Sequence, residues 1–209
     1  MKINFSNSPL LWNFFHRNYS MQKRKVMDLI RSVYKYVWVD MEMTGLDAEK
    51  DRILEISCYL SDAEINQLLP GPQLVIHQPE HVLNSMDEWC TTQHNKTGLV
   101  EESRKSKVRE SDAEKLLYDF LSSHIPYKAG IIAGNTVFMD KIFLGKYLPK
   151  VDDYLHYRIL DVSTLKELCR DWYPKIYESA PKKIGDHRAT GDILRSIEEL
   201  RFYKANIFK

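Results

Sequence analysis

The sequence predicts an α/β fold of three layers, with a mixed and mostly five-stranded central sheet. Two features of the order of elements support this prediction: three strand-like segments come first, and helices and strands then alternate. Composition is a third observation, because 209 residues with 44% hydrophobic and 28% charged side chains describe one globular domain with a sizeable core.

The first part of the predicted domain is made of strands. Residues 36–39 form a run of β-branched and aromatic side chains that ends at Asp40, and residues 52–60 form a second apolar run. Residues 73–77 make a third, and the Pro-Gly-Pro at 70–72 is interpreted as the turn before it. Three successive strands favour an antiparallel start to the sheet.

Helices and strands alternate from residue 111 onward. Residues 111–114 resemble a capping box, and leucine and phenylalanine recur behind them at helical spacing. The later elements are expected at 130–134 (strand), 141–148 (helix), 157–161 (strand), 162–172 (helix) and in a closing amphipathic helix that carries Ile193, Ile197 and Leu200.

Composition also excludes several classes of protein. No run approaches 18 apolar residues, so a membrane-spanning protein is not expected. Lys and Arg number 30 against 29 Asp and Glu, which argues against a protein that holds long nucleic acid through many phosphate contacts. The three cysteines, Cys58, Cys90 and Cys169, suggest neither a disulfide framework nor a zinc cluster, and we expect them to be reduced and mostly buried.

The amino-terminal segment differs from the rest of the chain. Residues 1–27 contain five Lys or Arg and no Asp or Glu, with aromatic and apolar side chains between them. This composition is typical of a mitochondrial transit peptide, and a disordered or docking tail is the alternative. Met21 is a candidate internal start for a second, untargeted form in the cytoplasm or nucleus. We therefore divide the chain into an extension, 1–33, and a globular domain, 34–209.

Acidic residues stand at the ends of several predicted elements. Asp40 and Glu42 are two apart at the end of the first strand, so their side chains project from the same face. Asp140 follows the glycine-bounded strand, at the start of the next helix. Asp192 lies in the closing helix, and His187, five residues earlier, is expected in the loop before it, because on one continuous helix the two would point about 140° apart.

Each of these acids also has an ordinary structural interpretation. Acids at a strand end are commonly solvated, and Asp140 would be favoured by the dipole of its helix. If the four converge on one cleft, each like-charged pair at about 4 Å costs about 4 kcal/mol at an effective dielectric near 20. Cations would then be needed, and oxygen ligands select Mg²⁺ or Mn²⁺, two of them in phosphoryl-transfer sites. A neutral histidine beside the attacking water can accept its proton.

Four segments together resemble a known family. They are 40–46 (DMEMTGL), 134–140 (GNTVFMD), 156–168 (HYRILDVSTLKEL) and 187–192 (HRATGD). They are similar to the oligoribonucleases, a group of 3′-to-5′ exonucleases with three acidic motifs and a histidine, and the resemblance extends over about residues 35–207.

The resemblance implies a ribonuclease H-like fold, a homodimer and a two-metal site. It assigns metal binding to Asp40, Glu42, Asp140 and Asp192, and the role of general base to His187. It also implies that the domain, 34–209, cuts single-stranded oligoribonucleotides only two to a few residues long into nucleoside 5′-monophosphates. No stable protein partner of another kind is expected.

Substrate contacts near the 3′ end carry over by the same resemblance. Leu46 corresponds to an apolar wedge between two bases, Trp89 to the side chain that packs on the 3′-terminal nucleoside, and His94 follows at the family's spacing. From the residues alone, Leu46 would be a packing residue and Trp89 equally well a core residue.

A second group corresponds to the site of the 5′ phosphate. Thr136, Arg158 and Ser163 match positions that hold this phosphate, and Tyr157 matches a tyrosine contributed across the dimer. Without the family, Arg158 would be a strand-edge ion pair and Tyr157 a packing residue. Asp161 is also an acid that matches the family, and we expect it to be structural.

The chain departs from the family pattern at three positions. Thr136 stands where serine is usual, which keeps the hydroxyl and adds a methyl group. Met139 replaces a polar residue and Gly191 a common acid, and neither change removes a predicted ligand.

A short substrate gains little from phosphate contacts along its length, so its affinity has to come from its ends. We expect a closed cap over the 5′ phosphate to exclude longer chains. Two alternatives stay open at this point: a general RNA or DNA 3′-to-5′ exonuclease with an open groove, and a non-catalytic nucleotide-binding protein.

Overall fold

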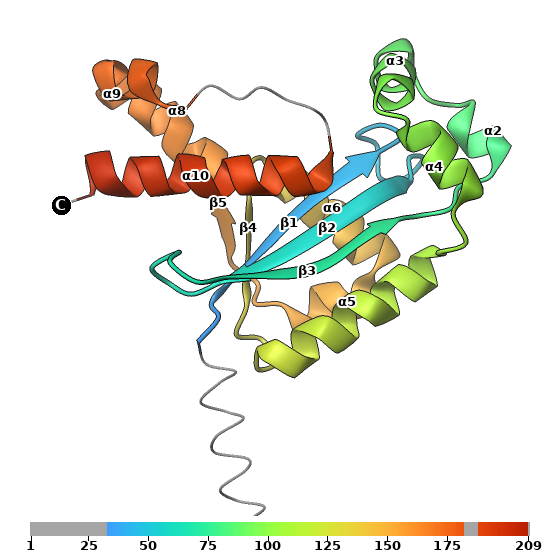
Figure 1. The fold of residues 1–209 in the computed structure, drawn as a ribbon, viewed down its shortest axis with the longest axis horizontal. Coiled ribbons are helices and arrows are strands. Elements are labelled where there is room, and N and C mark those ends of the chain that lie inside the picture. The colour runs from blue at the N-terminus through green and yellow to red at the C-terminus, as the bar shows by residue number, and fades with distance from the viewer. Residues whose placement is uncertain (1–32, 182–187, 209) are drawn as a thin grey trace, which may run out of the picture.

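The computed structural model describes residues 33–181 and 188–208, and their centre is one five-stranded sheet (Figure 1). The strands are β1 (Tyr36–Met43), β2 (Ile53–Ser61), β3 (Leu68–Val75), β4 (Ile131–Gly134) and β5 (Ile159–Asp161). They lie in the order β3-β2-β1-β4-β5. β2 pairs antiparallel with β1 and β3, whereas β4 pairs parallel with β1 and β5. The mixed sheet and its antiparallel start are confirmed.

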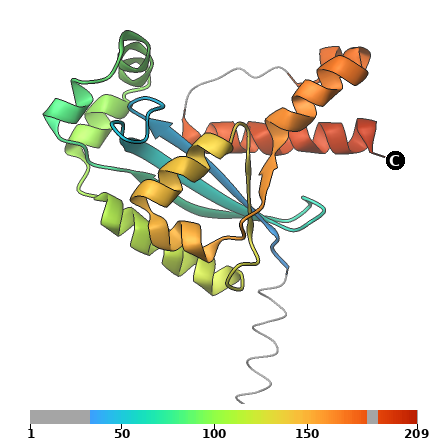
Figure 2. The same cartoon turned by 180° about the vertical axis from the view of Figure 1, so that it is seen from behind.

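Helices cover both faces of this sheet. They are α2 (Glu80–Leu83), α3 (Glu88–Lys96), α4 (Leu99–Lys105), α5 (Glu110–His124), α6 (Phe138–Tyr147), α7 (Pro149–Tyr154), α8 (Val162–Trp172), α9 (Pro174–Ser179) and α10 (Ala189–Ile207). In Figure 1, α10 runs across one face while α5 lies on the other, and the reverse view in Figure 2 shows α6 on the same side as α5, with α7 between them. Helices α2, α3 and α4 gather beyond one end of the strands. The predicted three layers are present.

Two apolar cores separate the layers. One lies between the sheet and α5, α6 and α7, and includes Val37, Ile56, Leu117 and Phe143, all 1% exposed or less. The other joins β1 and β4 to α8 and α10, around the fully buried Trp38. The Trp38 indole Nε1–H donates to Ser61 Oγ at 2.9 Å, so burial leaves this polar group paired. Successive residues of β1 therefore fill opposite cores, and this holds its carboxyl end in place.

The prediction of a turn at 70–72 is wrong. Pro70, Gly71 and Pro72 lie inside β3, and the chain reverses earlier, between Asp62 and Gln67. The sheet tolerates proline there because β3 is its edge strand, where an N–H is not required on the outer side. The pairing of β2 with β3 is also irregular between Ser57 and Tyr59, opposite the prolines.

Several helix boundaries differ from their predictions. The cap of α5 is Arg109, whose N–H donates to Asp112 Oδ2 at 3.0 Å, so the capping box predicted at 111–114 is wrong. Helix α6 begins three residues earlier than expected, and β5 is two residues shorter at its start. Helices α2, α3, α4, α7 and α9 were not predicted, because they have nine residues or fewer and show too little helical periodicity to be recognised.

All three cysteines are buried and free, as predicted. Burial raises the pKa of the Cys58 thiol to about 12 and keeps it protonated. Among the residues that the structure describes, no helix has the length and hydropathy to cross a bilayer. The proposed targeting segment, 1–33, lies outside the described residues except for its last residue. His187 also lies outside them.

Candidate active site

Three of the predicted metal ligands converge at the carboxyl end of β1. One carboxylate oxygen each from Asp40, Glu42 and Asp192 lies within 4.8 Å of the others. The period of two along β1 places Asp40 and Glu42 on the same face, and the first turn of α10 brings Asp192 to it. Arg195, one turn later, bonds Asp192 Oδ1 through Nη2 at 3.1 Å. Three half-buried carboxylates at this spacing repel one another and favour a bound cation.

Asp140, the fourth predicted ligand, lies beside this cluster and is more deeply buried. It is 6% exposed in the first turn of α6, and its carboxyl group faces the main chain of Met41 and the charges of Glu42 and Asp161. Burial, with smaller contributions from the charges of Glu42 and Asp161, raises the pKa of Asp140 to about 8. The Met41 contact places Asp140 next to β1, although it is not within the group formed by the other three acids.

The start of α10 is fixed by a buried ion pair. Arg188, the residue before the helix, bonds Glu55 of β2 through Nε at 3.0 Å and Nη2 at 3.1 Å, and Glu55 is fully buried. Its guanidinium also bonds both carboxylate oxygens of Glu102 in α4, and these pairs raise the pKa of Arg188, that with Glu55 most. The Ala189 N–H donates to Glu55 as well. Asp192 thus stands on a helix end that is tied to the sheet.

A pocket of about 540 Å³ adjoins the acidic cluster. It is lined by Glu42 and by residues of the loop after β1 and of α3, among them Leu46, Trp89 and His94. Leu46 is 70% exposed and Trp89 58% exposed, so neither is a packing or core residue in this chain. The three predicted contacts for the 3′ end of a substrate are therefore brought together next to Glu42. The exposed leucine and indole provide apolar surfaces that can stack on bases.

His94 is the buried member of this group, at 1% exposed. Its Nε2–H donates to the Met43 carbonyl at 2.9 Å, which turns Nδ1 toward Glu42, 3.9 Å from Oε2. This geometry places His94 behind Glu42, where it orients the end of β1.

Leu46 is held outward by a turn built around Asp51. The Asp51 carboxylate accepts bonds from Thr44 Oγ1 at 3.0 Å and from the Asp47 N–H at 2.9 Å. A Cβ atom at Gly45 would overlap this carboxylate, so a larger residue there would displace Asp51 from its hydrogen bonds. The Thr-Gly pair in the sequence is the signal of this turn.

The second predicted group meets at the start of α8. The Thr136 N–H donates to both Asp161 Oδ1 and Ser163 Oγ at 2.9 Å, and the hydroxyls of Thr136 and Ser163 lie 3.1 Å apart. Asp161 also caps α8 by accepting the Ser163 N–H at 2.9 Å, which fits the structural role expected for it. Thr136 has φ of 53°, a left-handed conformation rare for a β-branched residue. Such strain is retained where surrounding bonds enforce it.

Tyr157 and Arg158 are on the surface. Tyr157 is 74% exposed, and the Arg158 guanidinium lies over its ring at 5.3 Å from the centroid. Within the described residues, no salt bridge is made by Arg158, which disfavours the strand-edge ion pair. The two side chains precede β5 and are not packed into the sheet.

Comparisons with known proteins agree with this arrangement. Residues 37–200 match the family described as Exonuclease. The chain is 50% identical over 175 residues to a human protein named oligoribonuclease, mitochondrial, covering 84% of this chain and 74% of that one. It is 46% identical over 173 residues to the oligoribonuclease of Chromobacterium violaceum, covering 83% and 95%. The chain belongs to the oligoribonuclease family. It is therefore an enzyme of the nuclease class, and the non-catalytic alternative is set aside.

Solved structures support the fold expected of an oligoribonuclease. The RNase domain of the yeast Pop2 protein has a TM-score of 0.62 at 15% identity, covering 88% of this chain and 82% of that domain. Exonuclease I from Methylocaldum szegediense has a TM-score of 0.60 at 16% identity, covering 84% and 41%. These likenesses confirm the ribonuclease H-like exonuclease fold.

The acidic residues of this oligoribonuclease fit divalent metal ions. Their donors are all carboxylate oxygens, which suit hard cations. The raised pKa of Asp140 marks a carboxyl group whose ionised form lacks compensation, and a nearby cation would supply it.

Proposed function

We propose that the protein removes nucleoside 5′-monophosphates from the 3′ end of short single-stranded oligoribonucleotides, down to dinucleotides. The observation that carries this proposal is the juxtaposition of the acidic cluster with the pocket of Leu46, Trp89 and His94. A terminal nucleoside held in that pocket brings its 5′-linked phosphodiester to the carboxylates. Membership of the oligoribonuclease family supports the same reaction.

The metal ions are proposed to be two Mg²⁺ or Mn²⁺. Asp40, Glu42, Asp140 and Asp192 would hold them, and the ions would supply an activated water and stabilise charge on the leaving oxygen. His187 is assigned the proton from the attacking water. The Glu55–Arg188 pair keeps α10 in place, so that Asp192 meets the β1 carboxylates without rearrangement.

The 5′ end of the substrate is assigned to Thr136, Ser163 and Arg158. The Thr136 hydroxyl and the exposed Arg158 guanidinium are suitable donors for a terminal phosphate, whereas Ser163 donates its own proton to Asn135 Oδ1 at 3.0 Å and accepts the Thr136 N–H at 2.9 Å, which holds Thr136 in place. A phosphate bound there leaves no path for further nucleotides on the 5′ side, and this limits substrate length. The alternative is a general exonuclease with an open groove. The series of substrates of different length described below distinguishes the two.

We also propose a homodimer that completes the phosphate site. Tyr157 is 74% exposed, and Ile159, Leu168 and Trp172 are exposed apolar residues along β5 and α8. β5 is the open edge of the sheet, opposite to β3. An exposed apolar surface of this kind, next to Tyr157 and Arg158, favours burial against a second copy of the chain. Sedimentation of the wild type and of Trp172→Lys tests this, with a monomeric wild type as the contradicting result.

The amino-terminal extension, 1–33, is proposed to direct the enzyme to mitochondria and the domain, 34–209, to carry the activity. Proteins named mitochondrial oligoribonuclease in human, cattle and mouse support the location. A form that begins at Met21 would stay in the cytoplasm or nucleus. Fusion of residues 1–33 to a fluorescent protein tests targeting directly, and a diffuse signal would refute it.

The proposed function is tested with a ladder of 5′-phosphorylated oligoribonucleotides from two to twenty residues. With Mg²⁺, dinucleotides should be converted fastest, the only products should be nucleoside 5′-monophosphates, and EDTA should stop the reaction. Equal rates for dimers and twenty-mers would support the open-groove exonuclease instead. Intact dinucleotides would refute the proposal.

A further inference from the structure

A chain of hydrogen bonds joins the proposed phosphate site to helix α10. Its central residue is Asn135, the neighbour of Thr136. Asn135 Nδ2 donates to Ser196 Oγ at 2.7 Å and to Glu199 Oε2 at 3.1 Å, and both acceptors belong to α10. On its other side, Asn135 Oδ1 accepts from Ser163 Oγ at 3.0 Å.

The donors and acceptors of this chain run in one direction only. Ser196 Oγ–H donates to the Asp192 carbonyl at 2.8 Å, so its oxygen accepts from Asn135. Glu199 offers acceptors alone when ionised. The Asn135 amide therefore has one orientation, with Oδ1 toward Ser163. Because Oδ1 takes the Ser163 proton, the Ser163 oxygen is left to accept the Thr136 N–H at 2.9 Å.

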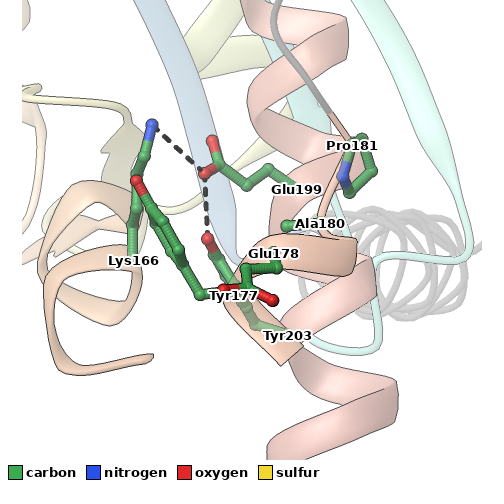
Figure 3. Close-up of a pocket in the computed structure, with 7 residues that line it drawn as sticks. All are labelled: Lys166, Tyr177, Glu178, Ala180, Pro181, Glu199 and Tyr203. Carbon is green, nitrogen blue, oxygen red and sulfur yellow. Dashed lines mark hydrogen bonds and ion pairs between the residues drawn. The ribbon is translucent and has the colours of Figure 1, made fainter. Parts of the chain in front are cut away.

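Glu199 is the buried anchor of this chain. It is 3% exposed, and its second oxygen, Oε1, accepts from Tyr203 Oη at 3.2 Å and lies 3.9 Å from Lys166 Nζ (Figure 3). A pocket of about 580 Å³ borders these side chains, which come from α8 and α10. A carboxylate as buried as that of Glu199 needs hydrogen-bond partners in fixed positions, so its bond keeps the Asn135 amide in one position.

The same helix carries the metal ligand Asp192. Ser196 lies four residues and Glu199 seven residues after Asp192, which corresponds to about 6 and 10 Å along the axis of α10. Helix α10 thus carries one residue of the acidic cluster and, through Ser196 and Glu199, is also bonded to the phosphate site. If Thr136 binds a terminal phosphate, the separation between the two sites is the room available for the nucleotides of the substrate.

We propose that Asn135 and Glu199 are positioning residues that tie the 5′-phosphate site to α10 and so set the length of oligonucleotide the enzyme accepts. This inference rests on the proposed function, because it needs Thr136, which Ser163 holds in place through the Thr136 N–H, to bind a terminal phosphate. Neither Asn135 nor Glu199 contacts the substrate. They act through Ser163 and Thr136, whose hydroxyls they keep at a fixed distance from Asp192.

The test compares three substrates: a dinucleotide with a 5′ phosphate, the same dinucleotide with a 5′ hydroxyl, and a 5′-phosphorylated pentanucleotide. Asn135→Leu and Glu199→Met should raise KM for the first by about tenfold, the loss expected for one or two hydrogen bonds to a charged group. KM for the 5′-hydroxyl dinucleotide and kcat for both dinucleotides should stay within about twofold of the wild type. The preference for dimer over pentamer should fall by about tenfold.

Two variants serve as matched controls. Glu199→Gln keeps an acceptor for Asn135 and should retain the preference, whereas the exposed neighbour Glu198→Met should behave as the wild type. Ser196→Ala is a milder change that removes one acceptor and keeps α10 intact. It should lower the preference by about fivefold or less even if the two larger changes impair folding.

The possible outcomes distinguish a failure of this inference from a failure of the proposed function. A wild type that treats the two dinucleotides alike would overturn the phosphate site and this inference with it. A wild-type preference that persists in folded Asn135→Leu, Glu199→Met and Ser196→Ala would overturn the inference alone. Equal losses on both dinucleotides would also overturn it, because they indicate general damage to the fold.

Discussion

The two ends of the active site are built in different ways. At the acidic end, Asp40, Glu42 and Asp192 stand on β1 and α10, and Asp140 is 6% exposed against β1. At the phosphate end, Tyr157 is 74% exposed and Arg158 lies over it on the surface. Between them, Thr136 is bound through its main chain to Asp161 and Ser163.

This difference teaches which parts of the reaction a single chain can support. The groups proposed to bind metal ions are fixed by buried strands and a tethered helix, so their geometry is preorganised. The exposed tyrosine and arginine lack such support from the described residues, and a second copy of the chain is proposed to supply it. The following predictions separate the contribution of each end, starting with the largest effect.

The largest effect is expected at the acidic end, from Asp40→Asn. The change removes one charge from the cluster while keeping the side-chain volume, so metal binding should weaken and kcat should fall by at least about a thousandfold, or about 4 kcal/mol. Initial rates on a dinucleotide with saturating Mg²⁺ measure this. The exposed acid Asp171→Asn is the control, and near-normal turnover by Asp40→Asn would remove Asp40 from the site.

A large effect on stability is expected from Glu55→Gln. The change leaves Arg188 with an incomplete partner at a fully buried position, and about 3 kcal/mol of the free energy of unfolding should be lost. Glu102→Gln affects the other, 46% exposed partner of Arg188 and should cost under about 1 kcal/mol. Urea unfolding of both variants measures the difference. Equal costs would mean that the buried pair does not tether α10.

A smaller effect is expected at the phosphate end, from Arg158→Ala. Loss of a charge-assisted contact of about 2 kcal/mol should raise KM for a 5′-phosphorylated dinucleotide by about thirtyfold. KM for the 5′-hydroxyl dinucleotide should change little, and so should the stability of this surface position. The control Arg170→Ala, on α8, should leave both KM values unchanged. Loss on both substrates would assign Arg158 a role other than phosphate binding.

The smallest effect is expected from Trp89→Ala, in the base pocket. One lost stacking interaction is worth about 1 to 3 kcal/mol, so KM should rise by about tenfold with kcat nearly unchanged. Because Trp89 is 58% exposed, the melting temperature should stay within about 2 °C. A marked loss of stability would indicate a packing role instead.

The sequence predicted the acidic end better than the phosphate end. The strand period fixed the shared face of Asp40 and Glu42, and the apolar spacing of the last helix located Asp192. The exposure of Leu46 and Trp89 depends on how the loop after β1 and α3 pack against the strands, and no local pattern reports it. The resemblance to a family, not the residues alone, predicted that these two side chains contact the substrate.

Two features could not be read from the sequence for physical reasons. Pro70 and Pro72 are turn formers in general, and only the edge position of β3 makes them compatible with a strand. Asn135 is more than sixty residues from Ser196 and Glu199 in the chain, and nothing in the two segments indicates that they bond one another. On a helical wheel Glu199 lies about 100° or more from each of Ile193, Ile197 and Leu200, so its burial could not be predicted from the apolar spacing of the closing helix.

The most direct test of the central claim is the position of metal ions in crystals soaked with Mn²⁺ and a phosphorothioate dinucleotide. The account predicts two anomalous peaks within about 4 Å of each other, in contact with carboxylate oxygens of Asp40, Glu42 and Asp192. The 3′-terminal base should lie in the pocket between Leu46 and Trp89. Manganese bound elsewhere, with these carboxylates vacant and the dinucleotide outside that pocket, would contradict it.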